Sequence, residues 1–189
     1  MEKDKSLRTE ANTIRIHKIE PDSLVDGEGL RIAIFTAGCS HGCVGCHNPE
    51  LQQPENCVEM STDRFAIDLL DVTDEFIDGF TVTGGDPLYD VNNCHRILNV
   101  ISGIKEDHQD VWLYTGYDIE VIPFLILKLV DVVVDGKYEQ DRSEGLYRGS
   151  DNQCIWKKVM EEDDTVRYKN TSRSGEFFTK NRKPKTDSI

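Results

Sequence analysis

Three cysteines lie within eight residues of one another, and their thiols are the strongest candidates for chemistry in the chain. Cys39, Cys43 and Cys46 have the spacing C-x3-C-x2-C and follow an apolar run at residues 30–37. Thiolates are soft ligands, and a cubane iron–sulfur cluster usually has one for each of its four irons. Three close thiolates can therefore hold three irons and leave the fourth open to a small molecule, as catalytic zinc keeps one position open.

The same cysteines allow two simpler interpretations. A structural zinc site could add His47 or His41 as a fourth ligand. Adjacent residues such as Cys46 and His47 rarely point at one ion, however, and zinc modules usually take ligand pairs from two separate segments. Three ordinary buried thiols are the other interpretation. The cysteine spacing alone leaves the cluster and both alternatives open.

The composition is that of one globular domain. A chain of 189 residues can bury one sizeable core. Its N-terminus lacks the apolar core of a signal peptide, and its longest apolar run is too short to span a bilayer. We therefore expect a cytoplasmic protein with no membrane contact. In that reducing compartment, three clustered and three scattered cysteines favour a metal or redox site over disulfides.

The charge is strongly acidic but unevenly distributed. The net charge of −13 argues against a nucleic-acid partner, because nucleic-acid-binding surfaces carry a basic stripe. Residues 165–189 contain seven basic and two acidic side chains. We predict a loose arm at residues 1–10, one domain at residues 11–163, and a basic, flexible extension at residues 164–189.

Hydrophobic patterning predicts strands that alternate with helices. We expect strands at residues 13–19 (ended by Pro21), 30–37, 79–83, 111–115, 131–134 and 154–159, and helices at about 61–72, 91–105 and 119–129. Ser61, Thr62 and Asp63 offer capping oxygens for the first helix, and Asp90 is placed to cap the second. This alternation predicts an α/β fold with right-handed crossovers and a mainly parallel sheet, with fewer strands than the eight of a full barrel.

Unusual residues follow the ends of the predicted strands. The cysteine loop follows the strand at 30–37, and residues 84–87, 116–117 and 135–137 follow the later ones. In α/β proteins this edge of the sheet binds ligands. By itself, the Gly-Gly-Asp-Pro sequence at 84–87 indicates only a tight turn into a helix.

Six segments together resemble the radical S-adenosylmethionine superfamily and, more narrowly, its activating proteins of anaerobic ribonucleotide reductases. They are DGEGLR at 26–31, FTAGCSHGCVGCHN at 35–48, TGGDPL at 83–88, LYTGY at 113–117, VDGK at 134–137 and YRGSDNQ at 147–153. They occur in the family's order and cover roughly residues 14–160. The resemblance implies the radical S-adenosylmethionine fold, an incomplete (β/α)6-type barrel with mainly parallel strands.

The resemblance also implies a cofactor set. Cys39, Cys43 and Cys46 would ligate a [4Fe–4S] cluster, and the amino and carboxylate groups of S-adenosylmethionine would bind its open iron. Backbone carbonyls at Gly84 and Gly85 would accept hydrogen bonds from the ligand's ammonium. The residues expected to bind the cofactor are Gly45, Cys46, His47, Thr83, Gly84, Gly85, Asp86, Asp135 and Lys137.

The side chains in this set have different expected contacts. Asp86 would add negative charge near the ammonium, whereas Asp135 and Lys137 could contact the ligand's carboxylate or ribose or simply form a turn. His47 stands where the superfamily often has Tyr or Phe, and its ring could lie against adenine. Loop chemistry explains Arg148, Ser150 and Gln153 equally well, so we assign them no role.

The implied reaction acts on another protein. One electron, from a donor such as flavodoxin, would cleave S-adenosylmethionine to methionine and a 5′-deoxyadenosyl radical. That radical would take hydrogen from a glycine Cα in the large subunit of anaerobic ribonucleoside-triphosphate reductase. The alternatives are an activase of another glycyl-radical enzyme, a small-molecule enzyme of the deazapurine synthase type, and, outside the superfamily, a structural-zinc binding module.

Overall fold

The computed structural model describes residues 12–142, 145–173 and 175–182. The arm predicted at residues 1–10 and the last seven residues of the predicted extension lie outside the described residues.

Strands outnumber helices along the described chain. The strands are β1 (Thr13–Ile16), β2 (Lys18–Ser23), β3 (Arg31–Thr36), β4 (Val58–Ser61), β5 (Gly79–Gly84), β6 (Asp110–Tyr114), β7 (Val132–Asp135), β8 (Cys154–Glu162), β9 (Thr165–Asn170) and β10 (Phe177–Asn181). The helices are α2 (Thr62–Val72), α3 (Val91–Ile104) and α4 (Phe124–Leu127), with 3-10 turns η1 (Pro49–Gln52), η2 (Pro87–Asp90) and η3 (Ile119–Val121).

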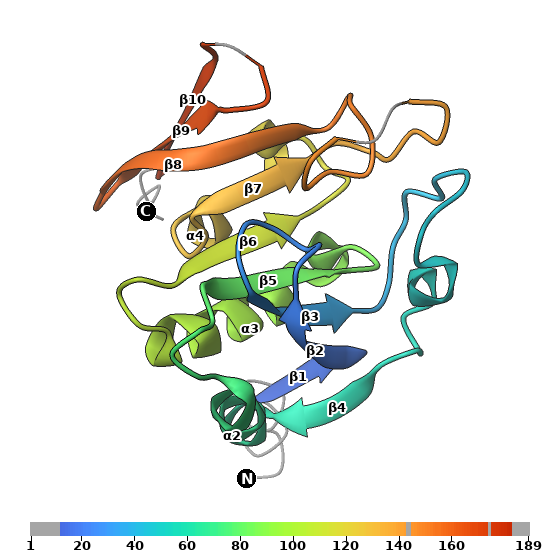
Figure 1. Cartoon of the computed structure of the whole chain (residues 1–189), viewed down its shortest axis with the longest axis vertical. Coiled ribbons are helices and arrows are strands. Elements are labelled where there is room, and N and C mark those ends of the chain that lie inside the picture. Colours follow the sequence, from blue (N-terminus) through green and yellow to red (C-terminus); the bar gives the residue numbers. More distant parts are fainter. Residues whose placement is uncertain (1–11, 143–144, 174, 183–189) are drawn as a thin grey trace, which may run out of the picture.

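The main sheet is mixed, which corrects the prediction of a mainly parallel one. Its eight strands have the order β10-β9-β8-β7-β6-β5-β3-β2. Among its described neighbouring pairs, only β3–β5, β5–β6 and β6–β7 are parallel, and the pairs beyond them on either side are antiparallel. Among the described strands, β10 and β2 form the two edges of this sheet. The fold is therefore α/β with an open, mixed, strand-rich sheet (Figure 1).

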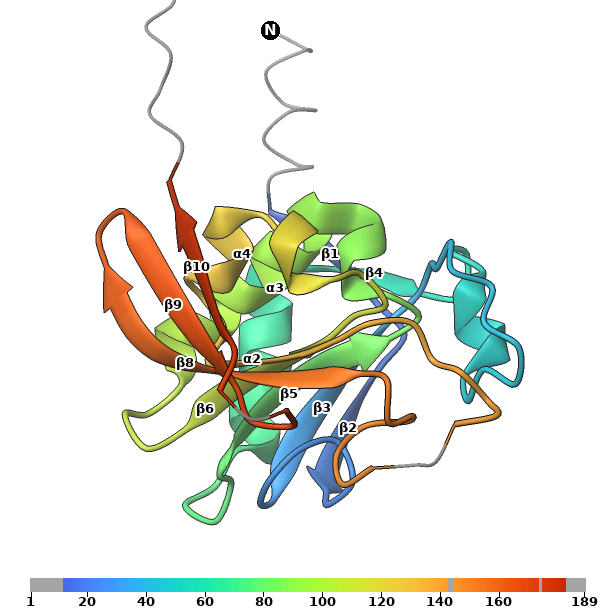
Figure 2. The same ribbon diagram turned by 90° about the horizontal axis from the view of Figure 1, so that it is seen from above.

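The helices cover one face of this sheet, and the two faces bury different side chains. Figures 1 and 2 show α2, α3 and α4 on the same side of the strands. Because side chains alternate along a strand, Val111 and Leu113 of β6 join the large cluster that includes Ile97 of α3, whereas Trp112 joins a smaller cluster with Val134. The core therefore lies mainly between the sheet and the helices.

The two long helices begin where the sequence predicted. Ser61 precedes α2 and its side chain accepts a hydrogen bond from the backbone N–H of Arg64. Asp90 precedes α3 and its carboxylate accepts one from the N–H of Asn93. Both contacts satisfy backbone donors that have no partner in the first turn of a helix. The predictions of these helices and their caps are confirmed.

The structure differs from the predicted elements at two prolines, Pro21 and Pro123. Pro21 does not end a strand but lies within β2, which pairs only with β3 in the described sheet. An edge strand tolerates proline, and the pairing is irregular between Glu20 and Ser23. The predicted helix at 119–129 is divided into η3 and α4 around Pro123, because proline cannot donate the backbone hydrogen bond of a helix interior.

The predicted flexible extension instead continues the sheet where it is described. Strands β9 and β10 pair antiparallel with β8 and with each other. Val166 and Tyr168 are fully buried, and the Tyr168 hydroxyl donates to the carbonyl oxygens of Leu127, at 2.7 Å, and Val130, at 2.6 Å. The inward face of this hairpin therefore closes over the end of α4.

The parallel register brings the predicted motifs to one edge. Thr36 at the end of β3 pairs with Gly84 at the end of β5, and Tyr114 at the end of β6 pairs with Val134. Figures 1 and 2 show the cysteine loop and the segment after β7 at this same edge. Among the described residues, no helix is long and apolar enough to cross a membrane.

Candidate functional site

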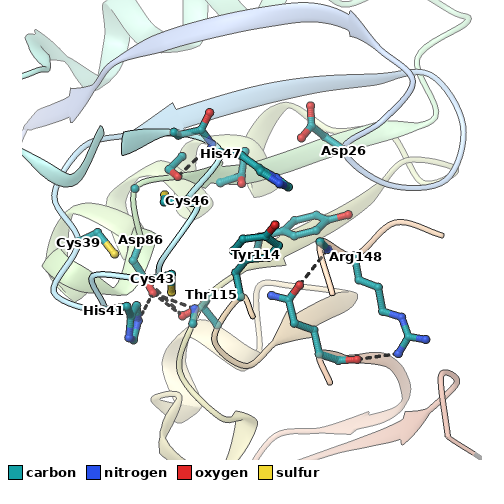
Figure 3. Close-up of a pocket in the computed structure, with 18 of the residues that line it drawn as sticks. Asp26, Cys39, His41, Cys43, Cys46, His47, Asp86, Tyr114, Thr115 and Arg148 are labelled. Carbon is teal, nitrogen blue, oxygen red and sulfur yellow. Dashed lines mark hydrogen bonds and ion pairs between the residues drawn. The ribbon is translucent and has the colours of Figure 1, made fainter. Parts of the chain in front are cut away.

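A cavity of about 680 Å³ lies at the carboxyl ends of the parallel strands. The cysteine loop, the residues after β5 and β6, and the segment before β8 all contribute to its walls. Cys39, Cys43 and Cys46 line it together (Figure 3). The cavity is therefore where this chain concentrates its soft metal ligands.

The environment of Cys39 disfavours a free thiolate. All three cysteines of the loop are unpaired and half-buried. Burial raises the pKa of the Cys39 thiol, the backbone of His41 lowers it, and the negative charges of Asp86 and of the other two cysteines raise it further. A bound metal centre reverses this balance because it supplies the positive charge that keeps thiolates ionised.

Three thiols from one loop are the soft donors of this cavity. Among the described residues, no group of three His, Cys, Asp or Glu side chains converges closely enough to hold one metal ion. Thiolates are the ligands of iron–sulfur clusters and also occur in structural zinc sites.

The segment after β5 packs directly against the cysteine loop. The N–H of Gly85 donates to the carbonyl of Thr36 at 2.9 Å, and the N–H of Asp86 donates to that of Gly38 at 2.8 Å. A Cβ added to Gly85 would lie 2.4 Å from the carbonyl oxygen of Leu51 and 2.6 Å from that of Gly38. A side chain at residue 85 would therefore keep the cysteine loop from packing against the end of β5, and glycine is required there.

Asp86 is buried and surrounded by hydrogen-bond donors. One carboxylate oxygen lies 2.6 Å from Nε2 of His41 and accepts from the N–H of Gly116 at 2.9 Å. The other accepts from the N–H of Leu88 at 2.9 Å and from the hydroxyl of Thr115 at 3.0 Å. Figure 3 shows this carboxylate between the cysteine loop and the residues that follow β6.

The other residues predicted to bind the cofactor divide into two groups. Cys46, His47, Thr83, Gly84 and Gly85 line the cavity with Asp86. The described lining does not include the three remaining members, Gly45, Asp135 and Lys137.

Those three residues have other surroundings. Asp135 is buried, accepts a hydrogen bond from the N–H of Ile119 at 2.7 Å, and has its pKa raised to about 6 by burial. Lys137 is exposed, and its carbonyl accepts from the side chain of Asn152. Gly45 lies beside the side chain of Gln140.

An aromatic side chain that the sequence did not predict lies beside His47. The ring of Tyr138, in the segment after β7, is 4.6 Å from the His47 ring between centroids and also lines the cavity. His41, the other histidine considered as a zinc ligand, instead contacts Asp86 and packs edge-on against Tyr117 at 4.5 Å.

Arg148, Ser150 and Gln153 hold the segment before β8 together. The Gln153 side chain accepts from the N–H groups of Gly149 and Ser150 and donates to the carbonyl of Gly136. Arg148 donates to the carbonyls of Asp151 and Gln153. These bonds fix one wall of the cavity against the end of β7, so the polar residues have a structural use in the chain itself.

Sequence reasoning missed other residues of the wall. Asp26, Tyr114 and Thr115 line the cavity, and each belongs to a segment that carried the family resemblance. That membership was the signal that could have identified them. Three large apolar side chains also line the cavity and remain exposed: Leu24 at 68%, Val25 at 78% and Leu146 at 76%.

Comparison with known proteins places this cavity in a wider context. Residues 25–156 match the family model described as a 4Fe-4S single cluster domain. The chain is 40% identical over 143 residues to the anaerobic ribonucleoside-triphosphate reductase-activating protein of Enterobacteria phage T4, covering 74% of this chain and 91% of that protein. It is 34% identical over 148 residues to the protein of the same name from Pasteurella multocida, covering 72% and 93%.

A third relative extends the same similarity. The protein of that name from Escherichia coli strain K12 is 31% identical over 149 residues, covering 74% of this chain and 96% of its own length. The family match spans the cysteine loop and every strand from β3 to β7. The residues that form the cavity therefore lie almost entirely within the region of similarity, whereas β9 and β10 follow its last residue, 156.

Proposed function

The chain belongs to the family of anaerobic ribonucleoside-triphosphate reductase-activating proteins, and on that premise we propose that it generates a glycyl radical on such a reductase. The observation that carries the proposal is the position of Cys39, Cys43 and Cys46, which line one cavity at the carboxyl edge of the sheet. This edge is where α/β proteins bind ligands.

The proposed roles follow from the walls of the cavity. Cys39, Cys43 and Cys46 would hold a [4Fe–4S] cluster that binds S-adenosylmethionine. The residues that position this ligand come from the cavity-lining part of the predicted set: Cys46, His47, Thr83, Gly84 and Gly85. Asp135 and Lys137 are not needed for the proposal, because their side chains have other surroundings. When bound, a reduced cluster would supply the one electron for cleavage of the ligand to methionine and a 5′-deoxyadenosyl radical.

The parallel part of the sheet serves this site as a partial barrel. Strands β3, β5, β6 and β7 with their helices form the unit that we assign to an incomplete (β/α)6-type radical S-adenosylmethionine fold. Its carboxyl edge carries the cysteine loop and the turns after β5 and β6. The antiparallel strands β8 to β10 extend the sheet on one side.

The mouth of the cavity suits a protein substrate. Leu24, Val25 and Leu146 are exposed there on two separate loops, although large apolar side chains usually leave water. A polypeptide segment that bears the target glycine would cover these side chains and exclude water from the reacting atoms. We assign the role of that segment to the large subunit of the reductase.

The electron donor and the location complete the proposal. A small one-electron carrier such as flavodoxin would reduce the cluster. The six cysteines are free thiols, a state that a reducing cytoplasm maintains.

The test is anaerobic activation of a reductase. The protein, with its cluster reconstituted, is incubated with S-adenosylmethionine, a reductant and a purified anaerobic ribonucleoside-triphosphate reductase, and electron paramagnetic resonance follows the product. We expect a glycyl radical on the reductase and a matching amount of 5′-deoxyadenosine. The Cys43→Ala variant, which removes one cluster ligand, serves as the inactive control.

Two results would count against the proposal. A preparation that stays colourless and free of iron after reconstitution would contradict the proposed cluster. Formation of 5′-deoxyadenosine without any glycyl radical on the reductases offered would contradict the proposed protein substrate.

A further inference from the structure

Asp86 is a buried carboxylate that several hydrogen-bond donors surround. Its side chain is 1% exposed and the contacting side chain of His41 is 7% exposed. The donors around it come from the turn that it begins, through Leu88, from the cysteine loop, through His41, and from the end of β6, through Thr115 and Gly116. One buried carboxylate thus links three segments that meet at the cavity.

These contacts occupy the acceptor capacity of the group. A carboxylate offers about four lone-pair directions on two oxygens. The N–H groups of Leu88 and Gly116 and the hydroxyl of Thr115 take three of them. Because a carboxylate only accepts, the fourth contact is a hydrogen bond when Nε2 of His41 carries its proton. With the proton on Nε2 of His41, all four acceptor directions of Asp86 are occupied by the protein itself.

The contact with His41 also requires close packing. A Cβ added to Gly116 would lie 2.5 Å from Cδ2 and 2.6 Å from Nε2 of the His41 ring. The ring is held on another side by Tyr117, whose centroid is 4.5 Å away. His41 lies between Cys39 and Cys43 in the sequence, so fixing its ring fixes the backbone that carries both thiols.

We propose that Asp86 is a positioning residue, which fixes the cysteine loop to the ends of β5 and β6 through His41, Thr115 and Gly116 and does not bind the ligand's ammonium. The inference rests on the proposed function, since it assigns to Asp86 a part in holding the cluster ligands. It differs from the role that the family resemblance implied for Asp86, which was to place negative charge near the ligand's ammonium. Groups that orient metal ligands typically contribute 10–100-fold to metal affinity.

The test measures cluster retention and ligand binding separately. Asp86→Asn preserves the size of the side chain but turns N–H groups toward the donors around it. We expect the reconstituted variant to release iron to a chelator about tenfold faster than the wild type. In the fraction that retains its cluster, we expect the KM for S-adenosylmethionine, measured by 5′-deoxyadenosine formation without reductase, to change less than about twofold.

Two further variants make the comparison specific. Thr115→Val removes only one hydroxyl donor, so we expect a smaller increase of iron release in the same direction, and circular dichroism confirms that it folds. Asp78→Asn is the matched control, because Asp78 also accepts a backbone N–H, that of Leu30 at 2.7 Å, but lies at the amino end of β5. Its iron release is expected to equal that of the wild type.

The outcomes separate this inference from the proposed function. Wild-type iron release in both Asp86→Asn and Thr115→Val would show that Asp86 does not hold the cysteine loop and would overturn the inference. A raised KM with normal iron release would show that Asp86 serves the ligand and would overturn it as well. Absence of a glycyl radical with the wild-type protein would instead overturn the proposed function, and it leaves the comparison of iron release intact.

Discussion

At the scale of single residues, two buried carboxylates near the same edge of the sheet differ in the donors around them. Asp86 meets donors from three segments, whereas Asp135 accepts from the N–H of Ile119 and has its pKa raised to about 6, chiefly by burial. Burial disfavours the charged form of a carboxyl group unless hydrogen bonds offset the loss of water. Asp135 is therefore a cost to the folded state at neutral pH.

This cost predicts a pH-dependent effect of Asp135→Asn. The folded pKa of about 6 lies above the ordinary value of 3.8, so the stability linked to the protonated group is complete below pH 4 and is lost as the pH rises through 6. We expect the variant to gain stability relative to the wild type between pH 4 and 6, reaching about 1–3 kcal/mol above pH 6.

Urea unfolding of the two iron-free proteins under reductant measures this difference. Comparing them at each pH removes the contribution of the other titrating groups. A difference that stays constant from pH 4 to 7, or one that favours the wild type at pH 7, would contradict the assignment of a raised pKa to Asp135.

At the scale of secondary structure, the elements that the sequence predicted well carry local signals. Helices α2 and α3 combine an apolar face with a capping residue, Ser61 or Asp90, and both signals lie within a few residues of one another. The strands β3, β5, β6 and β7 are short, largely buried segments rich in β-branched and aromatic residues, and turns follow them. Their parallel register then placed the cysteine loop and residues 84–87 at one edge, as expected.

The features that the sequence did not reveal depend on distant partners. His41 and Asp86 are 45 residues apart and Gly116 lies 30 residues beyond Asp86, so no local pattern links them. In β9 a local signal existed, because Val166 and Tyr168 alternate with charged residues. The basic composition of the same segment instead suggested a flexible extension. Which partner a strand finds, and in which direction, is decided by packing against α4 and β8.

The packing of β9 predicts the effect of removing one hydroxyl. Tyr168→Phe keeps the ring but leaves the buried carbonyls of Leu127 and Val130 without the donor that joins them to β9. We expect the free energy of unfolding to fall by about 1–3 kcal/mol, as measured by urea denaturation. Tyr89→Phe, at a half-exposed ring, is the control and is expected to change it by less than about 0.5 kcal/mol. Equal effects of the two variants would mean that the hairpin adds little to the fold.

At the scale of the whole molecule, the exposed apolar residues fall into those at the cavity mouth and those elsewhere. Leu24, Val25 and Leu146 line the cavity. Phe76, which is 69% exposed, lies before β5 and so at the opposite edge of the sheet. Substitutions at the two places can therefore distinguish a role in binding the protein substrate from a general effect on solubility.

The double substitution Leu24→Ser and Val25→Ser is predicted to impair radical transfer to the reductase while sparing the cleavage of S-adenosylmethionine. We expect 5′-deoxyadenosine formation without reductase to stay within about twofold of the wild type, because neither side chain belongs to the cysteine loop. Glycyl radical formation on the reductase is expected to fall about tenfold or more, since burial of each side chain contributes roughly 1.5–3 kcal/mol. Rates of both products, measured in parallel, check this.

Phe76→Ser is the matched control for that experiment. It removes a similarly exposed apolar side chain and is expected to leave both rates unchanged. Equal losses of radical transfer in the mouth variant and in Phe76→Ser would contradict a substrate-specific role for the mouth.

The linkage of the cysteine loop to the ends of β5 and β6 also sets an order of events during biosynthesis. Cys46 leaves the ribosome well before the residues that fix its loop, since Asp86 and Gly116 are translated 40 and 70 residues later. Closing such long loops costs entropy that only the completed sheet offsets. A nascent chain therefore presents three thiols on an unsupported segment, and we expect iron–sulfur delivery to wait until the polypeptide has been made through β6.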